Sequence, residues 1–355
     1  MRSEKYRKAN RSRLVLLLAL TVLVLFAAIK FINFASWYTP VHVSDEGFSH
    51  AEQFAGCVAV NGIDVSEFQG EDIKWKKVKA SGVDFAFIRA GYRSVDTGNL
   101  NADSTFDKNI QAAQRVGIMT GAYFYSQAIT PDEAIEEAEY AIELVKAYDL
   151  ELPLVIDFEI YSGGRLDKAI SGGTMNYAQA YHDIVLAFCE TVEAAGYDSG
   201  IYANTDMLTH YMDASLIDDA SNLWVAEFSS SCSLNSGYRW WQCSDSTEIG
   251  GTDKTVDHDF MYINTAGVTK LWYVNPGKRV SMEKCRVKLK KDSVKYKRSG
   301  AEVKAIVTDP EGRRMREGKD YTLSYVNNTE RGTAYAVVRG INGYRDIITA
   351  EYDIE

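Results

Sequence analysis

The sequence is poor in proline, histidine and cysteine, with five of each among 355 residues. Few prolines and a hydrophobic content of 46% exclude a disordered chain and indicate a globular protein with a sizeable core. No cysteine stands in a CxxC pair and the histidines are scattered, which argues against a zinc site. Phosphate loops, dinucleotide fingerprints and nucleophile elbows are also missing. We therefore expect neither a metal nor a cofactor.

Positive charge is scarce in the central region. Residues 34–275 carry 14 Lys and Arg against 36 Asp and Glu, whereas residues 276–355 carry 18 against 12. The acidic centre argues against a nucleic acid partner. The basic end suits an anionic polymer or surface, although a solvated charged face gives the same composition.

The longest hydrophobic run lies near the N-terminus. Six basic residues precede an apolar run from Leu14 to Ile29, and Lys30 interrupts it before a few more apolar residues follow. With a snorkelling lysine, this run reaches the roughly 20 residues of a spanning helix, and the basic cluster places the N-terminus inside. We expect residues 1–35 to form a cytoplasmic tail and a single transmembrane helix in the cell membrane. A cleaved signal peptide is the alternative, and both export the remainder.

An exported chain permits disulfides. Cys232 and Cys243 flank a predicted hairpin, and Cys57 and Cys285 bracket the middle region, so each pair is a candidate bridge. Cys189 lies in a helical pattern and is expected to be a buried thiol.

A regular alternation of strand and helix patterns begins at residue 58, after a polar segment (residues 36–57) that we expect to be a stalk. The strand candidates are Val58–Asp64, Phe85–Arg89, Met119–Phe124, Leu154–Phe158, Gly200–Ala203, Leu223–Phe228, Tyr238–Cys243 and Val256–Tyr262. The helix candidates are Ile73–Ala80, Ser104–Val116, Pro131–Tyr148 and Tyr177–Ala195. About five βα units followed by three strands predict an α/β fold, an irregular TIM-like barrel over residues 58–275.

Carboxylates stand at the C-terminal ends of these strands, where such barrels carry their chemistry. Asp64 ends the first strand, and Asp157 and Glu159 end the fourth with one residue between them. Alternate residues of a strand share a face, so this pair is expected about 6.5–7 Å apart along the strand. Mutual repulsion should make one carboxyl hold its proton more tightly. An acid beside a carboxylate is what glycoside hydrolysis requires, and Asp257 after a later strand adds to this pattern.

Several motifs, in chain order, resemble family 25 of the glycoside hydrolases, the Ch-type lysozymes. They are Val60–Gly70 (VNGIDVSEFQG), Phe85–Tyr92 (FAFIRAGY), Gly121–Ser126 (GAYFYS), Leu154–Glu159 (LVIDFE), Gly200–Asn204 (GIYAN), Trp240–Gln242 (WWQ) and Val256–Asp257. The resemblance covers roughly residues 58–265 and implies an irregular (β/α)5(β)3 barrel. It also implies N-acetylmuramidase activity, which cleaves the β-1,4 bond between N-acetylmuramic acid and N-acetylglucosamine in the glycan strands of peptidoglycan.

The resemblance also implies roles for individual residues. Glu159 matches the general acid, and Asp157 matches a neighbouring carboxylate that either orients the substrate's N-acetyl group or attacks directly. Asp64 and Asp257 match the family's other two acidic positions. The candidate glycan contacts are Tyr123, Tyr202, Arg89, Trp241 and Gln242.

One position departs from the family pattern. The family commonly has asparagine two residues after the acid of its closing motif, whereas this chain has Asp259. The acid itself, Asp257, is retained. We expect the additional carboxyl to change the pH dependence rather than to abolish activity.

Residues 280–355 predict a second, all-β domain, because short alternating runs are separated by glycines and asparagines. The strand candidates are Val287–Leu289, Val303–Thr308, Tyr321–Val326, Ala334–Arg339 and Ile347–Ile354. They predict a small antiparallel Ig-like sandwich. The segment Gly318–Asn328 resembles an Ig-like module of Gram-positive surface proteins, which implies a spacer or a wall contact.

The sequence therefore predicts a membrane-tethered peptidoglycan hydrolase for local cell-wall remodelling. An inactive barrel that only binds the wall is the alternative, and the four retained acids argue against it. A chitinase is disfavoured, because Leu152 and Val155 occupy two positions that are acidic in the chitinase motif.

Overall fold

The computed structural model describes residues 43–210, 222–234, 237–264, 280–340, 344–345 and 347–355. The predicted anchor over residues 1–35 lies outside this part of the chain. Within the described ranges, no helix combines the length and apolar character needed to cross a membrane.

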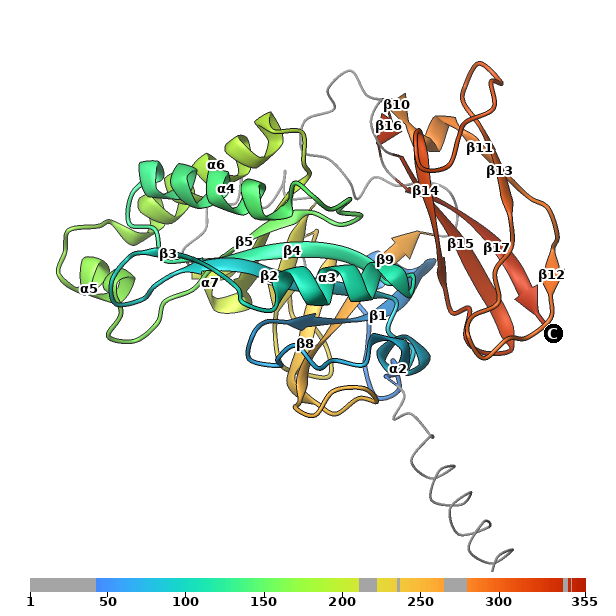
Figure 1. Ribbon diagram of the computed structural model, residues 1–355. Helices are drawn as coiled ribbons and strands as arrows, with labels where there is room; N and C mark the ends of the chain where they lie inside the picture. Colours follow the sequence, from blue (N-terminus) through green and yellow to red (C-terminus); the bar gives the residue numbers. More distant parts are fainter. Residues whose placement is uncertain (1–42, 211–221, 235–236, 265–279, 341–343, 346) are drawn as a thin grey trace, which may run out of the picture. The chain divides into compact units, whose positions relative to one another are not determined.

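Eight strands of the described chain close into a barrel, as predicted (Figure 1). They are β1 (Cys57–Val65), β2 (Phe85–Arg93), β4 (Met119–Ser126), β5 (Leu154–Phe158), β6 (Ser199–Asn204), β7 (Leu223–Ala226), β8 (Trp240–Thr247) and β9 (Val256–Asn264). Neighbouring strands from β1 to β8 pair in parallel, but β9 runs antiparallel to both β8 and β1. The start of β9 therefore lies at the end of the barrel where the parallel strands finish.

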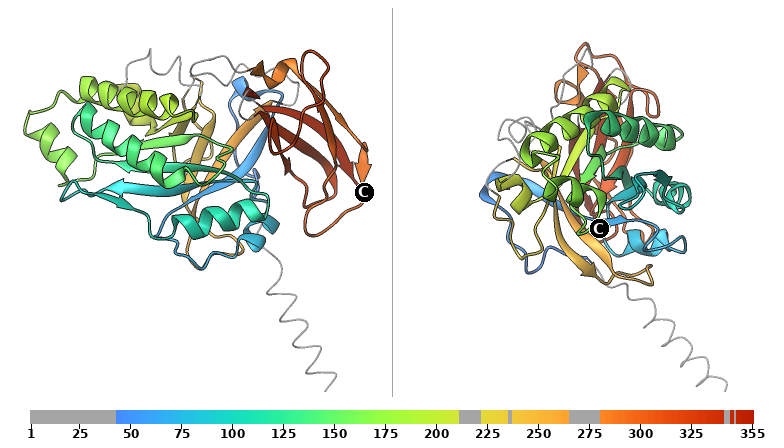
Figure 2. Two further views of the ribbon diagram at one scale, coloured as in Figure 1. Left: turned by 45° about the horizontal axis from the view of Figure 1, so that its top comes forward. Right: turned by 90° about the vertical axis from the view of Figure 1, so that its left-hand side faces the viewer.

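Helices cover the outside of the barrel (Figures 1 and 2). They are α2 (Trp75–Ala80), α3 (Phe106–Arg115), α4 (Pro131–Val145), α5 (Arg165–Ser171), α6 (Tyr177–Ala194) and α7 (Thr205–His210). Helix α4 begins as predicted, because Pro131 occupies its first turn and the Thr130 side chain accepts a hydrogen bond from the Glu133 amide. The short helices α5 and α7, and strand β3 (Leu100–Ala102), were not predicted, since they are too short for a periodic pattern.

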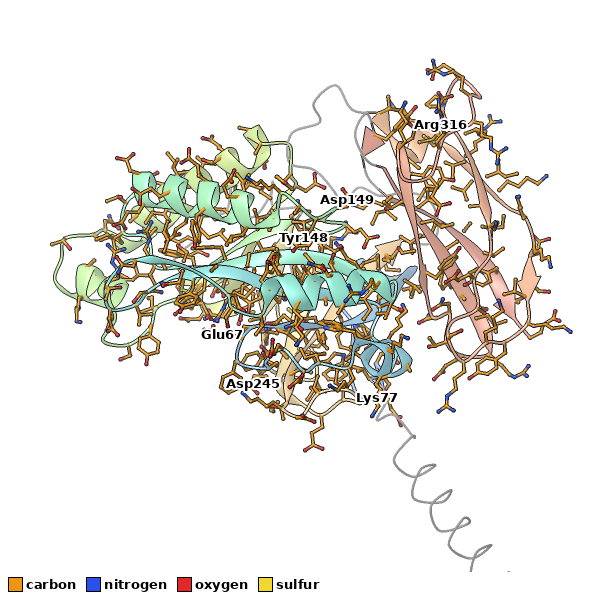
Figure 3. All side chains as sticks on the ribbon, viewed as in Figure 1. Glu67, Lys77, Tyr148, Asp149, Asp245 and Arg316 are labelled. Carbon is orange, nitrogen blue, oxygen red and sulfur yellow. The ribbon has the colours of Figure 1, made fainter. Side chains whose placement is uncertain are left out.

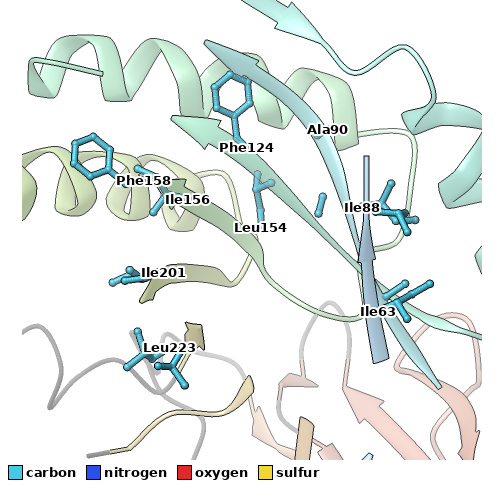
Figure 4. Close-up of a cluster of buried hydrophobic side chains, with 14 of the residues drawn as sticks. Ile63, Ile88, Ala90, Phe124, Leu154, Ile156, Phe158, Ile201 and Leu223 are labelled. Atoms are coloured by element: carbon cyan, nitrogen blue, oxygen red, sulfur yellow. The ribbon is translucent and has the colours of Figure 1, made fainter. Parts of the chain in front are cut away.

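Alternation along each strand separates two apolar clusters. The outer cluster lies between strands and helices, and Figure 4 shows the members Ile63, Ile156 and Phe158. Val155, which alternates along β5 with Leu154 and Ile156 of the outer cluster, belongs to a second cluster, and the barrel members of that cluster fill the interior. Glycines make room there: a Cβ on Gly121 would lie 2.5 Å from the Phe87 ring. On β1 and β5, the residues that alternate with members of the outer cluster therefore point into the barrel interior.

The predicted stalk needs a correction from residue 43 onward. Val43 is buried, and Phe54, in the short 3₁₀ helix η1 (Glu52–Phe54), stacks on Tyr262 with ring centroids 3.6 Å apart. Phe48 packs edge-on against Phe260. Residues 43–56 are thus part of the barrel's outer packing. The stalk was predicted because the three apolar side chains stand among polar neighbours, which gave the segment a polar composition.

Both candidate disulfides are absent. Within the described structure, no disulfide joins any of the five cysteines, Cys57, Cys189, Cys232, Cys243 and Cys285. The Cys243 thiol instead donates a hydrogen bond to the His258 carbonyl, 3.3 Å away. Sequence separation alone gave no information on whether the Cβ atoms would meet.

The region after residue 280 is all-β. Its strands are β10 (Val280–Ser281), β11 (Arg286–Leu289), β12 (Ser293–Val294), β13 (Ala305–Thr308), β14 (Tyr321–Val326), β15 (Gly332–Gly340), β16 (Tyr344–Arg345) and β17 (Ile347–Ile354), with a 3₁₀ turn η2 (Met282–Lys284). One sheet has the order β12-β17-β15-β14, and β11 pairs with β13. The pairing is not wholly antiparallel as expected, because β12 runs parallel to β17 and β10 to β16.

Candidate active site

Four predicted acidic residues gather at one end of the barrel. Asp64 is the second-last residue of β1, Asp157 lies on β5, and Glu159 follows that strand directly. Asp257 is the second residue of β9, and the antiparallel register places it directly opposite Asp64. Two strands that end at the site, β1 and β5, and one strand that begins there, β9, thus supply carboxyls to the same place.

Three aspartates and a glutamine form one buried hydrogen-bonded cluster. Asp64 hydrogen-bonds to Asp257 and Asp259 through side chains, and Gln242 Nε2 donates to Asp64 Oδ2 over 2.7 Å. The Tyr202 hydroxyl donates to Gln242 Oε1 over 2.7 Å. Carboxyls can bond to each other only if protons are shared between them, so this cluster holds protons at neutral pH.

The electrostatics of this cluster agree with shared protons. Burial, and then the Asp259 carboxyl, raises the pKa of Asp64 well above its usual range. Burial and Asp64 raise the pKa of Asp257 to about 9. Burial and Asp257 likewise raise the pKa of Asp259 well above its usual range. Trp224 Nε1 donates to Asp259 Oδ1 over 2.8 Å, while Asp259 Oδ2 has no protein partner among the described residues.

Asp157 and Glu159 form the second acidic group. Asp157 is 7% exposed, and its Oδ1 makes no hydrogen bond within the described chain. Burial and the Glu159 charge raise the pKa of Asp157, which the Arg89 guanidinium opposes. Burial raises the pKa of Glu159 too. Both carboxyls of this pair therefore favour the protonated form, Asp157 the more strongly, and the Arg89 guanidinium is the group that opposes this at Asp157.

Arg89 links three segments around the site. Its Nε donates to Asp103 Oδ2 over 2.9 Å, and its Nη2 lies 3.0 Å from Glu67 Oε1. Glu67 lies on the loop after β1 (Figure 3). About a fifth of the Arg89 side chain stays exposed, at 18%, so a glycan contact remains open to it.

A buried network fixes the chain at Glu159. Gln127, which directly follows β4, is fully buried and donates from Nε2 to the Glu159 carbonyl over 2.7 Å. Arg165 donates to the Gln127 carbonyl over 2.7 Å and pairs with Glu133. Glu137, itself paired with a buried arginine, accepts from the Gln127 amide. These bonds hold the backbone that carries the Glu159 side chain.

Exposed apolar side chains surround this end of the barrel. Phe68 follows β1, Tyr161 follows β5, and Phe228 follows β7. Their exposed fractions are 67%, 57% and 57%, unusually high for such large apolar groups. Flat apolar faces at the rim of an acidic site suit the faces of sugar rings.

The predicted glycan contacts separate into two groups. Tyr123 and Tyr202 lie in the interior cluster and Gln242 belongs to the acidic cluster. Trp241 requires a correction. It is fully buried in the outer cluster, its ring packs against Phe260, and its Nε1 donates to the Glu227 carbonyl. Gln242 faces inward, so its neighbour on the strand must face outward.

Three residues near the acids escaped the prediction. Tyr125 pairs in register with Asp157, and Trp224 bonds to Asp259. Tyr125 could have been identified because it is the next residue on the same face of the strand as Tyr123. Trp224 could have been identified from the alternation along the predicted strand 223–228. Gln127 had no periodic signal, because it follows the end of a strand.

Together these groups provide two neighbouring carboxyls with raised pKa values, Glu159 and Asp157, at the rim of a buried acidic cluster. The first can donate a proton to a leaving oxygen, and the second can stabilise developing positive charge.

Comparison with known proteins decides the family. The model of "Glycosyl hydrolases family 25" matches residues 63–252, which is more than half of the chain. The chain belongs to glycosyl hydrolases family 25. It is accordingly a glycoside hydrolase of the lysozyme type, as the motifs predicted.

The chain is similar to one curated protein and to several solved structures. Lysozyme M1 of Streptomyces globisporus is 28% identical over 208 residues, which are 56% of this chain and 67% of that protein. The spore cortex lytic enzyme SleM of Clostridium perfringens has a TM-score of 0.51 at 16% identity, covering 84% of this chain and 98% of its own. The autolysin LytC of Streptococcus pneumoniae aligns with a TM-score of 0.49 at 24% identity, over 58% of this chain and 47% of its own. The chain thus spans less than half of LytC.

The first prediction concerns Asp259. In the unfolded chain, aspartates lose their protons near pH 4, whereas in the folded cluster the pKa of Asp259 is raised well above that value and the pKa of Asp257 is raised to about 9. Between these values the folded state binds more protons, so the free energy of unfolding falls as pH rises. Asp259→Asn keeps the bond from Trp224 and removes one such carboxyl. We expect it to stabilise the protein by roughly 1–3 kcal/mol at pH 9 and by little at pH 5.

Denaturant unfolding at the two pH values measures this difference. The exposed Asp253→Asn variant is the control, with equal and small effects at both. A stabilisation by Asp259→Asn that did not grow with pH would contradict the shared-proton cluster.

The second prediction concerns Gln127. Gln127→Met keeps the shape of the side chain and removes the donor to the Glu159 carbonyl. A misplaced acid reduces the chemical step more than binding, so we expect kcat to fall about tenfold with KM within about twofold. Steady-state kinetics on soluble glycan fragments measures both constants.

Gln114→Met is the matched control, because the Gln114 amide also donates two hydrogen bonds, to Thr120 and to the Asp149 carbonyl, on α3 away from the acids. Equal losses of kcat in the two variants would show a general stability effect instead of positioning.

Proposed function

We propose that the chain hydrolyses the glycan strands of peptidoglycan at the β-1,4 bond between N-acetylmuramic acid and N-acetylglucosamine. The observation that carries the proposal is the Asp157–Glu159 pair at the C-terminal end of β5, set in a family 25 barrel. The name of the relative lysozyme M1 points to the same substrate class.

Glu159 serves as the general acid in this proposal. Burial raises its pKa, which favours the protonated form that a general acid needs, and its side chain is half-exposed where a leaving oxygen could reach it. Protonation of that oxygen lets the glycosidic bond break without expelling an alkoxide.

Asp157 acts on the opposite side of the reaction. It lies deeper, with one oxygen lacking a protein partner in the described chain, and Arg89 is the cation that opposes the rise of its pKa on burial. That free oxygen can either accept a hydrogen bond from the substrate's N-acetyl group or attack the anomeric carbon. In both routes, Asp157 stabilises the positive charge that develops at the anomeric carbon as the glycosidic bond breaks.

Asp64, Asp257, Gln242 and Tyr202 shape the base of the site. Their hydrogen bonds hold donors and acceptors in place for the hydroxyl and acetamido groups of a sugar. Tyr123 and the exposed Phe68, Tyr161 and Phe228 supply faces for the rings of neighbouring sugars.

We further propose that residues 1–35 anchor the enzyme in the cell membrane, with residues 58–275 outside and residues 280–355 forming an Ig-like module. The basic cluster ahead of an apolar run of the required length supports the anchor. A tethered hydrolase reaches only nearby wall, which favours local remodelling of the cell's own peptidoglycan.

The third prediction tests the acid. Glu159→Gln keeps the shape of the side chain and cannot donate a proton, so we expect kcat on purified peptidoglycan to fall by a factor of about 10²–10⁴. Mass spectrometry of fragments from the unaltered protein should show new reducing ends on N-acetylmuramic acid.

The exposed Glu139→Gln variant on α4 should digest normally. Reducing N-acetylglucosamine ends would overturn the bond assignment. Wall binding without any release of fragments by the unaltered protein would instead favour an inactive wall-binding protein.

The fourth prediction tests the anchor. We expect the full chain to remain with membranes after carbonate extraction of cells, and a variant lacking residues 1–35 to stay in the cytoplasm. Protease added to cells without their wall should digest the full chain's barrel. Recovery of the full chain in the soluble fraction, shortened at its N-terminus, would show a cleaved signal peptide.

A further inference from the structure

A groove of about 840 Å³ lies on the C-terminal β region, outside the barrel. Its floor includes Tyr321, Leu323 and Tyr325, which share one face of β14 because they are alternate residues. The Tyr325 hydroxyl donates to the Val303 carbonyl over 2.6 Å, which fixes the floor to the segment before β13.

Basic side chains dominate the rim. The groove is lined by five of them, against the two acids Glu302 and Glu317, which leaves a net charge of +3; they are Lys290, Lys297, Lys304, Arg314 and Arg316. All five are exposed, and none forms an ion pair within the described ranges. Figure 3 labels Arg316 on the segment between β13 and β14.

The rim is held in place by backbone bonds. The Lys290 amide donates to the Lys304 carbonyl over 2.8 Å, and the Met315 amide donates to the Val307 carbonyl over 2.9 Å. The Arg316 amide donates to the Asp320 carboxylate over 2.8 Å. The cations therefore stand on a fixed frame in which they outnumber the acids of the lining by five to two, and this excess of positive charge suits the binding of an anion.

We propose that this groove binds an anionic polymer of the cell wall, a polyol chain linked by phosphodiesters. The groove is open and larger than a single ion requires, so a section of an extended chain fits it. Each repeat carries one permanent charge, and arginine and lysine are the usual partners of phosphate oxygens.

Two other polyanionic partners fit less well. An anionic bilayer is bound by surfaces that also insert exposed apolar groups, but Val303 and Met315 in the groove are buried. Single-stranded nucleic acid needs exposed aromatic faces for its bases. Tyr321 is only 4% exposed, and Tyr325 is tied through its hydroxyl.

Titration calorimetry of the full chain with purified poly(glycerol phosphate) tests the proposal. The polymer contains no glycan, so an inactive hydrolase would leave this result unchanged. We expect Lys304→Gln/Arg314→Gln/Arg316→Gln to weaken binding about tenfold or more. Loss of three phosphate contacts should also reduce the salt dependence, the slope of log K against log salt, by about 2 to 3.

The matched control is Lys288→Gln/Lys291→Gln/Lys295→Gln, which removes the same charge from exposed residues outside the groove lining. It should change affinity by less than about twofold. Unchanged melting temperature and hydrolysis of soluble glycan fragments would show that both triple variants are folded.

Four outcomes would overturn the proposal. They are no binding to the polymer, equal losses in the two triple variants, tighter binding to polygalacturonate, and tighter binding to phosphatidylglycerol vesicles or to single-stranded oligonucleotides.

Discussion

Burial of carboxyls at one end of a closed barrel is the constraint on which the rest of the site depends. Asp64, Asp157 and Asp259 are each less than a tenth exposed. An isolated buried carboxylate is costly, so such groups must be protonated, hydrogen-bonded or paired. The barrel interior therefore carries Gln242 and Trp224 as donors, at positions where a purely structural barrel would carry aliphatic side chains.

The strand directions turn this constraint into a site. Each of the seven parallel barrel strands delivers its last residues to the acidic end, whereas the antiparallel β9 delivers its first residues. Asp257 and Asp259 consequently lie beside Asp64 although they begin a strand. The two acidic groups then differ in what surrounds them: Asp64 is held among Asp257, Asp259 and Gln242, whereas Asp157 lies beside Glu159 and Arg89.

Much of this could be predicted from local patterns, because alternation along a strand is a local property. It placed Asp157 inside the barrel with Phe158 outside, and the eight barrel strands were found within a few residues. The same rule should have turned Trp241 outward once Gln242 was placed inside, but the motif was treated as one unit. The hydrogen bonds of Gln127 with Glu159 and Arg165 join loops more than 30 residues apart, and no periodicity encodes such contacts. The packing of Phe54 on Tyr262 was hidden for the same reason.

The acidic end of the barrel and the basic groove after residue 280 account for much of the uneven distribution of charge along the chain. Residues 34–275 carry 36 acids against 14 basic residues, and several of those acids are needed for the hydrolytic site. Such a surface repels a polyanion, and the repulsion weakens only as salt screens it. A hydrolase working in a wall that contains anionic polymers would thus be driven away by its own catalytic domain. The basic groove after residue 280 reverses the sign locally, and its cations are exposed and without ion pairs in the described chain. Attraction at the groove offsets repulsion at the barrel, and the two opposite charges lie on different segments of the chain, with the acids of the site before residue 276 and the cations of the groove after residue 280.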